Sequence, residues 1–157
     1  EIPEHLPSFF SMYQRLLRLP GSKGVMKTLL RSAQFRRSRF AFGGALNDLS
    51  AIDGDFAKLF AQYWFEHPAR YAGMVRYLTG LDFSLIDRLP EVHEKITAPI
   101  HFIWGADDKT FPLELAKPMI SSMGSAVSLR TVEHCRFLPQ EEYPRLVASE
   151  VCAFMTD

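Results

Sequence analysis

Two loops in the second half of the sequence carry the side chains best suited to chemistry. Residues 105–112 include the adjacent carboxylates Asp107 and Asp108, and residues 133–142 include His134. An acid followed along the chain by a histidine is the second half of the order nucleophile, acid, histidine found in one class of catalytic triad. In such a triad the acid holds the imidazole in the tautomer that acts as a base. The two loops therefore predict nucleophilic hydrolysis, although this stretch contains no recognisable nucleophile.

Each of the two loops follows a segment with the pattern of a buried strand. Residues 98–104 form a short, almost continuous apolar run, which is typical of a strand buried on both faces of a parallel sheet. A second strand is predicted at residues 127–132, with helices at 113–123 and 144–154, so residues 97–157 are expected to fold as β-α-β-α. We predict that the two strands are adjacent and parallel, because ligands and catalytic groups gather at the edge where such strands end.

Residues 1–96 are predicted to form helices and loops. The clearest helix covers residues 56–64, where aromatic and aliphatic residues recur at helical spacing before His67 and Pro68 end it. Its aromatic residues are expected mainly in the core. Further apolar residues at helical spacing predict helices within Phe9–Leu17, Val25–Leu30 and Tyr71–Leu78, and a short helix is expected within 85–96. In the last helix, the inner face is predicted to consist of Leu146, Val147 and Val151.

Two parallel strands cannot bury both of their faces and edges alone. We therefore expect either the remaining N-terminal half of a sheet or a homodimer partner to complete them. The first residue is Glu1 rather than Met, which suggests processing, trimming or an incomplete chain. Expressed alone, the chain is expected to be inactive and prone to aggregate.

Composition is that of a globular protein, with 47% hydrophobic and 23% charged residues. The formal net charge is zero, yet residues 1–40 carry eight basic side chains against two acidic ones. Without interleaved aromatics this basic excess is best interpreted as a solvated helix face, so no nucleic-acid partner is predicted. The two cysteines match no metal spacing and indicate a reducing, cytoplasmic compartment. No membrane span, cofactor or metal is predicted.

The acid loop resembles that of α/β-hydrolases, most closely the branch of haloalkane dehalogenases, epoxide hydrolases and related esterases. The resemblance rests on the segments 103–108 (Ile-Trp-Gly-Ala-Asp-Asp) and 141–144 (Glu-Glu-Tyr-Pro). It covers residues 97–157 well and the whole chain loosely. It implies that Asp108, three residues after the glycine, is the triad acid, that Asp107 is a turn or capping acid, and that residues 1–96 are a helical cap.

The sequence departs from this family where the catalytic histidine is expected. The family usually has Gly-His-Phe a few residues before the glutamate, whereas this stretch places Arg136, Leu138 or Gln140 in the histidine position, depending on the gap. None of these side chains can act as a neutral base. His134 is the nearest imidazole, displaced by two residues or more, and it is the candidate base.

The sequence thus favours a hydrolase that acts on a small or medium apolar ester, epoxide or haloalkane. Asp108 would orient the base, for which His134 is the candidate, and the identity of the missing nucleophile, Ser or Asp, would decide the reaction. The alternative is a non-catalytic, hydrolase-like binding or interaction module without a working base. A third interpretation is a self-standing α/β protein that completes its sheet by dimerisation.

Overall fold

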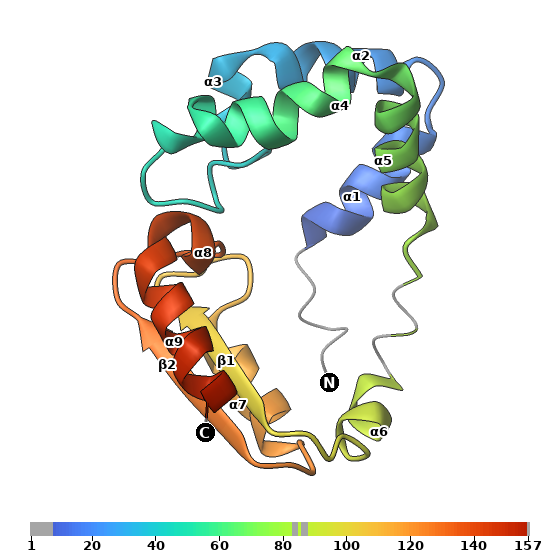
Figure 1. Ribbon diagram of the computed structural model, residues 1–157. Coiled ribbons are helices and arrows are strands. Elements are labelled where there is room, and N and C mark those ends of the chain that lie inside the picture. The colour runs from blue at the N-terminus through green and yellow to red at the C-terminus, as the bar shows by residue number, and fades with distance from the viewer. Residues whose placement is uncertain (1–7, 83–84, 86–87, 157) are drawn as a thin grey trace. The chain divides into compact units, whose positions relative to one another are not determined.

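The computed structural model describes residues 8–82, 85 and 88–156 and divides into two compact units (Figure 1). We call Pro7–Gly44 with Asp48–Asp82 the helical unit. Of the described residues, the sheet unit contains 45–47, 85 and 88–156. The chain is mixed α/β, as predicted.

The helical unit contains α1 (Ser8–Arg18), α2 (Ser22–Arg31), α3 (Ala33–Arg36), the 3₁₀ turn η2 (Ala51–Asp53), the π-helical turn η3 (Ala57–Ala61), α4 (Gln62–Glu66) and α5 (Pro68–Gly80). The helices predicted near residues 9–17, 25–30 and 71–78 are confirmed. Gly21 adopts a left-handed conformation (φ 78°) between α1 and α2, which glycine tolerates without steric cost.

The helix predicted at residues 56–64 is interrupted by η3, and this changes which side chains are buried. A π-helical turn contains one residue more than an α-helical turn, so the side chains that follow it point in a different direction from that expected for a regular α-helix. Ala57 and Ala61 are buried, whereas Phe60 and Tyr63 are exposed. The expectation that the aromatic residues here lie mainly in the core was therefore wrong for these two.

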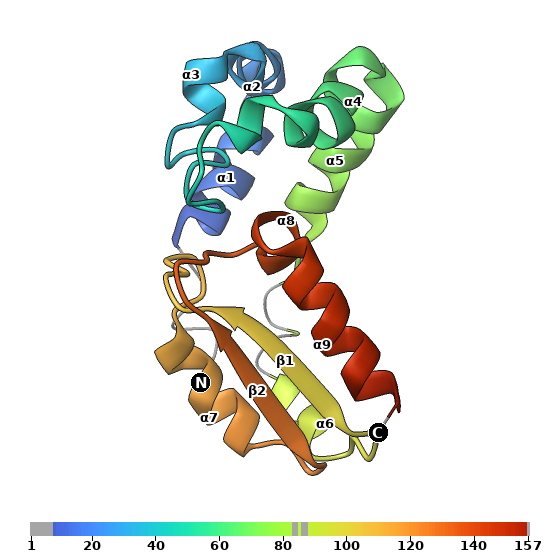
Figure 2. The ribbon, with the colours of Figure 1, turned by 60° about the vertical axis from the view of Figure 1, so that its left-hand side comes forward.

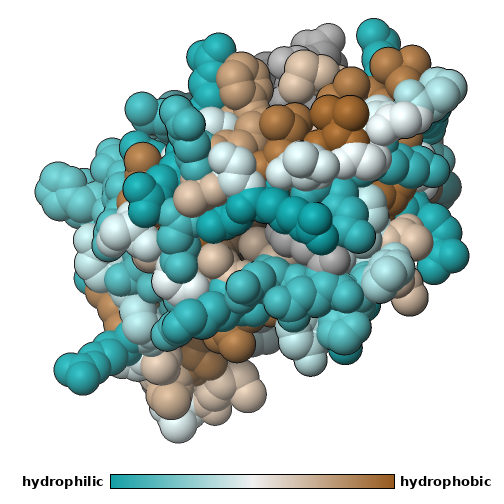
Figure 3. Space-filling view, turned by 90° about the horizontal axis from the view of Figure 1, so that it is seen from above, coloured by the Kyte–Doolittle hydropathy of each residue, from teal (hydrophilic) through white to brown (hydrophobic). Residues whose placement is uncertain are grey.

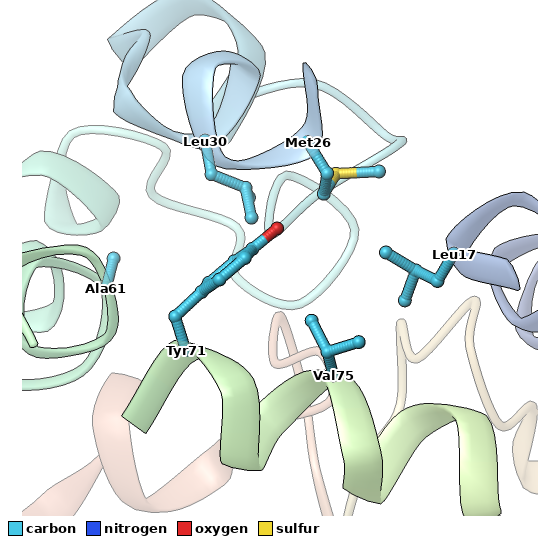
Figure 4. Close-up of a cluster of buried hydrophobic side chains, with 6 residues drawn as sticks. All are labelled: Leu17, Met26, Leu30, Ala61, Tyr71 and Val75. Atoms are coloured by element: carbon cyan, nitrogen blue, oxygen red, sulfur yellow. The ribbon is translucent and has the colours of Figure 1, made fainter. Parts of the chain in front are cut away.

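The core of the helical unit is a cluster of buried side chains from four of its segments (Figure 4). Its members are Leu17, Met26, Leu30, Ala61, Tyr71 and Val75. The Tyr71 hydroxyl donates a hydrogen bond of 2.5 Å to the carbonyl of Lys23, which satisfies the polar end of a buried ring. Asp53 pairs with Arg36 (2.7 Å) and Arg37 (2.5 Å). Burial opposes ionisation of Asp53, but the hydrogen bonds from the two guanidinium groups outweigh it and hold its pKa below the usual range.

The sheet unit contains α6 (Leu89–His93), β1 (Ile100–Gly105), α7 (Leu113–Ser121), β2 (Val127–Val132), α8 (Pro139–Glu142) and α9 (Pro144–Thr156). The prediction of adjacent parallel strands is confirmed, with Ile100 opposite Val127 and Gly105 opposite Val132. Helices α7 and α9 lie on opposite faces of this sheet (Figure 2).

Helix α9 packs on the sheet through polar as well as apolar groups. His101 of β1 stacks on Phe154 at 5.5 Å between ring centroids, and its Nδ1 lies 2.7 Å from the Ser128 hydroxyl. His101 is thus hydrogen-bonded and largely buried within β1. Val151, expected on the inner face of α9, is exposed, because the helix presents Glu150 and Phe154 to His101 instead.

Hydrophobic side chains also gather on the outside of the molecule, as the view from above shows (Figure 3). In the helical unit the exposed large ones include Phe40, Leu59, Phe60, Tyr63 and Tyr77. Arg70 covers the face of the Tyr63 ring, 3.8 Å from its centroid, an arrangement that favours a cation–π interaction.

Candidate functional site

The loops that follow β1 and β2 meet at one edge of the sheet and are joined through their backbones. The amide of Ala106 donates to the carbonyl of Val132 and the amide of Asp107 donates to the carbonyl of Cys135, both at 2.9 Å. The acid loop and the histidine loop are therefore held side by side, as the sequence predicted from parallel strand order.

Gly105 makes this close approach of the two loops possible. A Cβ atom built on Gly105 would overlap the carbonyl oxygens of both Cys135 and Arg136. Only a residue without a side chain fits here, because the obstacle is backbone rather than a movable side chain. The glycine of the acid-loop motif thus has a packing role that is independent of catalysis.

Asp108 is buried at this edge, with 7% of its surface exposed. Its Oδ1 accepts hydrogen bonds from the amides of Thr110 (2.7 Å) and Phe111 (2.9 Å). Burial raises the pKa of Asp108, and the hydrogen bonds from the Phe111 and Thr110 amides offset this rise only in part. The Trp104 indole closes the loop by donating to the Phe111 carbonyl at 2.9 Å. The carboxylate is therefore fixed by one oxygen, which leaves Oδ2 for another donor.

His134 lies on the neighbouring loop in an uncommon backbone conformation, with a φ of 54°. Its carbonyl accepts hydrogen bonds from Asn47 Nδ2 (2.5 Å) and the Tyr143 hydroxyl (3.3 Å), which hold this left-handed turn in place. Its side chain is 89% exposed, and Nδ1 lies 4.0 Å from Oδ2 of Asp107. Within the described residues the imidazole is thus directed to Asp107, and the hydrogen bond expected between His134 and Asp108 is not formed.

The residues that occupy the expected histidine position have other contacts. The Arg136 guanidinium donates to the carbonyl of Leu46 at 3.1 Å, Leu138 precedes α8, and Gln140 is exposed within α8. Phe137 lies between them, and its ring is 5.4 Å from that of Phe111 on the acid loop. No signal in the sequence indicated this pair of aromatic rings.

Glu142 is a further residue of the site that sequence reasoning missed. Its Oε1 accepts from the amide of Asn47 at 2.6 Å, and its Oε2 accepts from the amide of Arg136 at 2.7 Å. One carboxylate therefore ties the histidine loop to a segment about 90 residues earlier in the chain. The Glu-Glu pair was visible in the sequence, but a partner so distant in sequence was not.

Replacing Glu142 by Ala should loosen the loop that carries His134. Two hydrogen bonds to a charged acceptor are lost, each typically worth about 1.5–3 kcal/mol. We expect the amides of Asn47 and Arg136 to exchange with solvent hydrogen much faster in Glu142→Ala, while amides within β1 keep their protection. Glu141→Ala is the matched control, since Glu141 is exposed. Equal exchange rates of these amides in both variants would contradict the role of Glu142 in holding the histidine loop to Asn47.

Cys135 lies between these groups but does not supply a nucleophile. It is fully buried, and burial together with the nearby carboxylates Glu142, Asp108 and Asp107 raises its pKa to about 12. Its sulfur thus remains a thiol at neutral pH, whereas a nucleophilic cysteine requires the thiolate.

In the part of the chain that the structure describes, no cluster of three His, Cys, Asp or Glu side chains could hold a metal ion. No helix in the same residues has the length and apolar character needed to cross a bilayer.

Comparison with known proteins gives one informative similarity. The chain is 25% identical over 151 residues to the uncharacterized hydrolase YugF of Bacillus subtilis (strain 168). The match covers 96% of the chain and 48% of that protein, so the chain spans about half the length of the curated relative. No family model matches the chain, and no solved structure matches it significantly.

Proposed function

We propose that the chain is the cap-bearing C-terminal part of an α/β-hydrolase-fold enzyme that hydrolyses a small or medium apolar ester, epoxide or haloalkane. Asp108 acts as the triad acid and His134 as the base, and the nucleophile comes from outside these residues. One observation carries the proposal. A buried carboxylate, anchored by one oxygen, lies at the end of a parallel strand, next to the loop with the histidine.

The geometry of Asp108 suits the role of orienting an imidazole. The amides of Thr110 and Phe111 fix the carboxylate plane through Oδ1, so Oδ2 can accept an N–H from the base. The base then removes a proton from a serine nucleophile, or from the water that cleaves an ester formed on an aspartate nucleophile. His134 must rotate its exposed side chain away from Asp107 to take this position. Catalytic hydrogen bonds are often long without substrate.

The rest of the chain has supporting roles in this proposal. The segment predicted from sequence as a cap, residues 1–96, to which the helical unit belongs, excludes water and shapes specificity. The remaining strands of the sheet come from the N-terminal half of the protein or from a second copy. Free thiols at Cys135 and Cys152 support a cytoplasmic location.

A second candidate is a non-catalytic, hydrolase-like binding or interaction module. The observation that favours it is the environment of His134, whose side chain is 89% exposed and has Asp107 rather than Asp108 as its nearest carboxylate partner. In such a module Asp108 would have a structural role as the acceptor that closes its own loop.

Substitution of His134 separates the two candidates. His134→Asn keeps the left-handed backbone, which asparagine tolerates, and removes the base. In the full-length protein we expect kcat to fall by about 10²- to 10⁴-fold, the usual contribution of a general base. His134→Ala should show the same loss.

Arg136→Ala is the matched control on the same loop. It removes the hydrogen bond to Leu46 but no base, so kcat should fall by at most about tenfold. If His134→Asn hydrolyses its substrate at the wild-type rate, His134 is not the base. If the wild-type protein hydrolyses none of the three substrate classes, the second candidate holds.

A further inference from the structure

The helical unit contains an apolar cavity that the proposed chemistry does not use. Its volume is about 280 Å³. Leu17, Met26 and Leu30 of the buried cluster line it, together with Phe42 and Trp64. Among the described residues that line it there is no Asp, Glu, Lys, Arg or His side chain.

The cavity is partly open to solvent and large enough to hold a ligand. Protein interiors are close-packed, and voids larger than a water molecule are few. An engineered apolar cavity of about 150 Å³ in another protein stays dry and binds benzene. A cavity of about 280 Å³ is nearly twice as large and suits a molecule with two aromatic rings.

The walls of the cavity are built to meet a flat apolar molecule. The Phe42 ring packs edge-on against Phe56 with 5.2 Å between centroids and lies 6.4 Å from Trp64, so these rings are fixed by one another. Phe40 and Tyr77 also line the cavity but are exposed, which places them at its opening. A ligand can therefore enter from solvent and contact preformed aromatic surfaces.

We propose that the helical unit binds an uncharged, apolar molecule of about two aromatic rings in this cavity. The ligand is held by burial of its apolar surface and by contacts with the aromatic rings. A ligand with a charged group would bind more weakly, because that group would leave water without gaining a partner in the cavity. This goes beyond the proposed hydrolase function and does not depend on turnover, because every lining residue belongs to the helical unit.

Methionine methyl groups offer a direct test in the full-length protein. Of the six methionines in these 157 residues, Met26 and Met74 line the cavity, and Met12, Met119, Met123 and Met155 are not among its described lining residues. With ¹³C-methyl-labelled methionine and naphthalene as the probe, we expect the resonances of Met26 and Met74 to shift and saturate while the other four stay in place. Absence of any shift up to the solubility of naphthalene, or similar shifts of all six methyl groups, would overturn the proposal. The first result would mean that protein side chains fill or close the cavity.

A substitution that fills the cavity with a protein side chain gives the complementary test. It is read out by photolabelling, which needs only a low concentration of the labelling compound. Ala41 lines the cavity, and Ala41→Phe places a ring in it, whereas Val25→Phe adds the same ring at an exposed site of α2. Labelling by an uncharged aryl diazirine should fall by about tenfold or more in Ala41→Phe and stay unchanged in Val25→Phe. Naphthalene should compete with the label, and naphthalene-2-carboxylate should compete at least about tenfold less well. Equal labelling of the two variants, or equal competition by the two ligands, would contradict an apolar site in this cavity.

Discussion

Asp108→Asn in the full-length enzyme is expected to lower kcat by about 10⁴-fold, the effect of replacing a triad acid by its amide. The asparagine oxygen can still accept from the amides of Thr110 and Phe111, so the loop should keep its shape. What is lost is the negative charge that holds the imidazole in its basic tautomer. Steady-state hydrolysis of the best substrate measures the effect.

Asp107→Asn is the matched control, one residue away on the same loop. Asp107 is exposed and lies 4.0 Å from His134, so it is the competing acid. We expect its amide variant to retain most of the wild-type activity. The reverse result, in which Asp107→Asn is inactive and Asp108→Asn is active, would move the role of triad acid to Asp107.

The free energy of unfolding of Asp108→Asn, measured against pH, distinguishes a loss of catalysis from a loss of the fold. Burial raises the pKa of Asp108, so the folded chain binds the proton more tightly than the unfolded chain. The free energy of unfolding therefore falls as pH rises from the ordinary carboxyl pKa through the raised one. Asparagine cannot titrate, so the variant should lose this dependence and be at least as stable as wild type at neutral pH.

Gly105→Ala is expected to destabilise the sheet unit by about 3 kcal/mol or more, the upper range for overpacking. The added methyl group meets the backbone carbonyls of Cys135 and Arg136, so β1 and the histidine loop must separate. Urea unfolding followed by the fluorescence of Trp104, with Trp64 replaced by Phe, measures the change in β1 itself.

Gly24→Ala is the control for this substitution. Gly24 lies within α2, and a Cβ atom there meets nothing within 4 Å, so alanine should stabilise that helix by up to about 1 kcal/mol. If both variants unfold at the wild-type urea concentration, the close approach at Gly105 does not constrain the site.

The strands and most helices of this chain follow from local patterns. The apolar run at residues 100–104 and the Pro and Gly residues that bound it suffice to predict a parallel strand, and β1 is found there. Its residues 100–104 are half-buried, so the expected burial on both faces is not seen in the described residues. The order of strand, helix and strand then brings the acid and histidine loops together. The exposure of Phe60 and Tyr63 was not predictable, because η3 shifts the helical period within an otherwise regular stripe.

The fine structure of the site depends on contacts between distant segments. The amide of Asn47 reaches Glu142 and its side chain reaches the carbonyl of His134, and nothing in the local sequence at either end indicates this. These bonds hold His134 in the left-handed region, which determines the direction of its side chain. A sequence pattern can therefore predict that Asp108 and His134 share an edge, but not whether the imidazole reaches Asp108 or Asp107.

The proposal that this chain belongs to a hydrolase is tested most directly by trapping its covalent intermediate. The full-length protein is mixed with p-nitrophenyl butyrate, styrene oxide or 1-bromobutane, quenched with acid within one turnover, and weighed by intact-mass spectrometry. We expect one substrate to leave its acyl or alkyl group on the protein, on a residue outside the 157 described by this sequence. An alkyl ester on an aspartate nucleophile should accumulate in His134→Asn, because this variant cannot activate the water that cleaves the ester. A serine nucleophile needs the base in order to react, so its acyl adduct should form in the wild type and not in His134→Asn. Absence of an adduct and of turnover with all three substrates would contradict the hydrolase proposal and leave the non-catalytic module in its place.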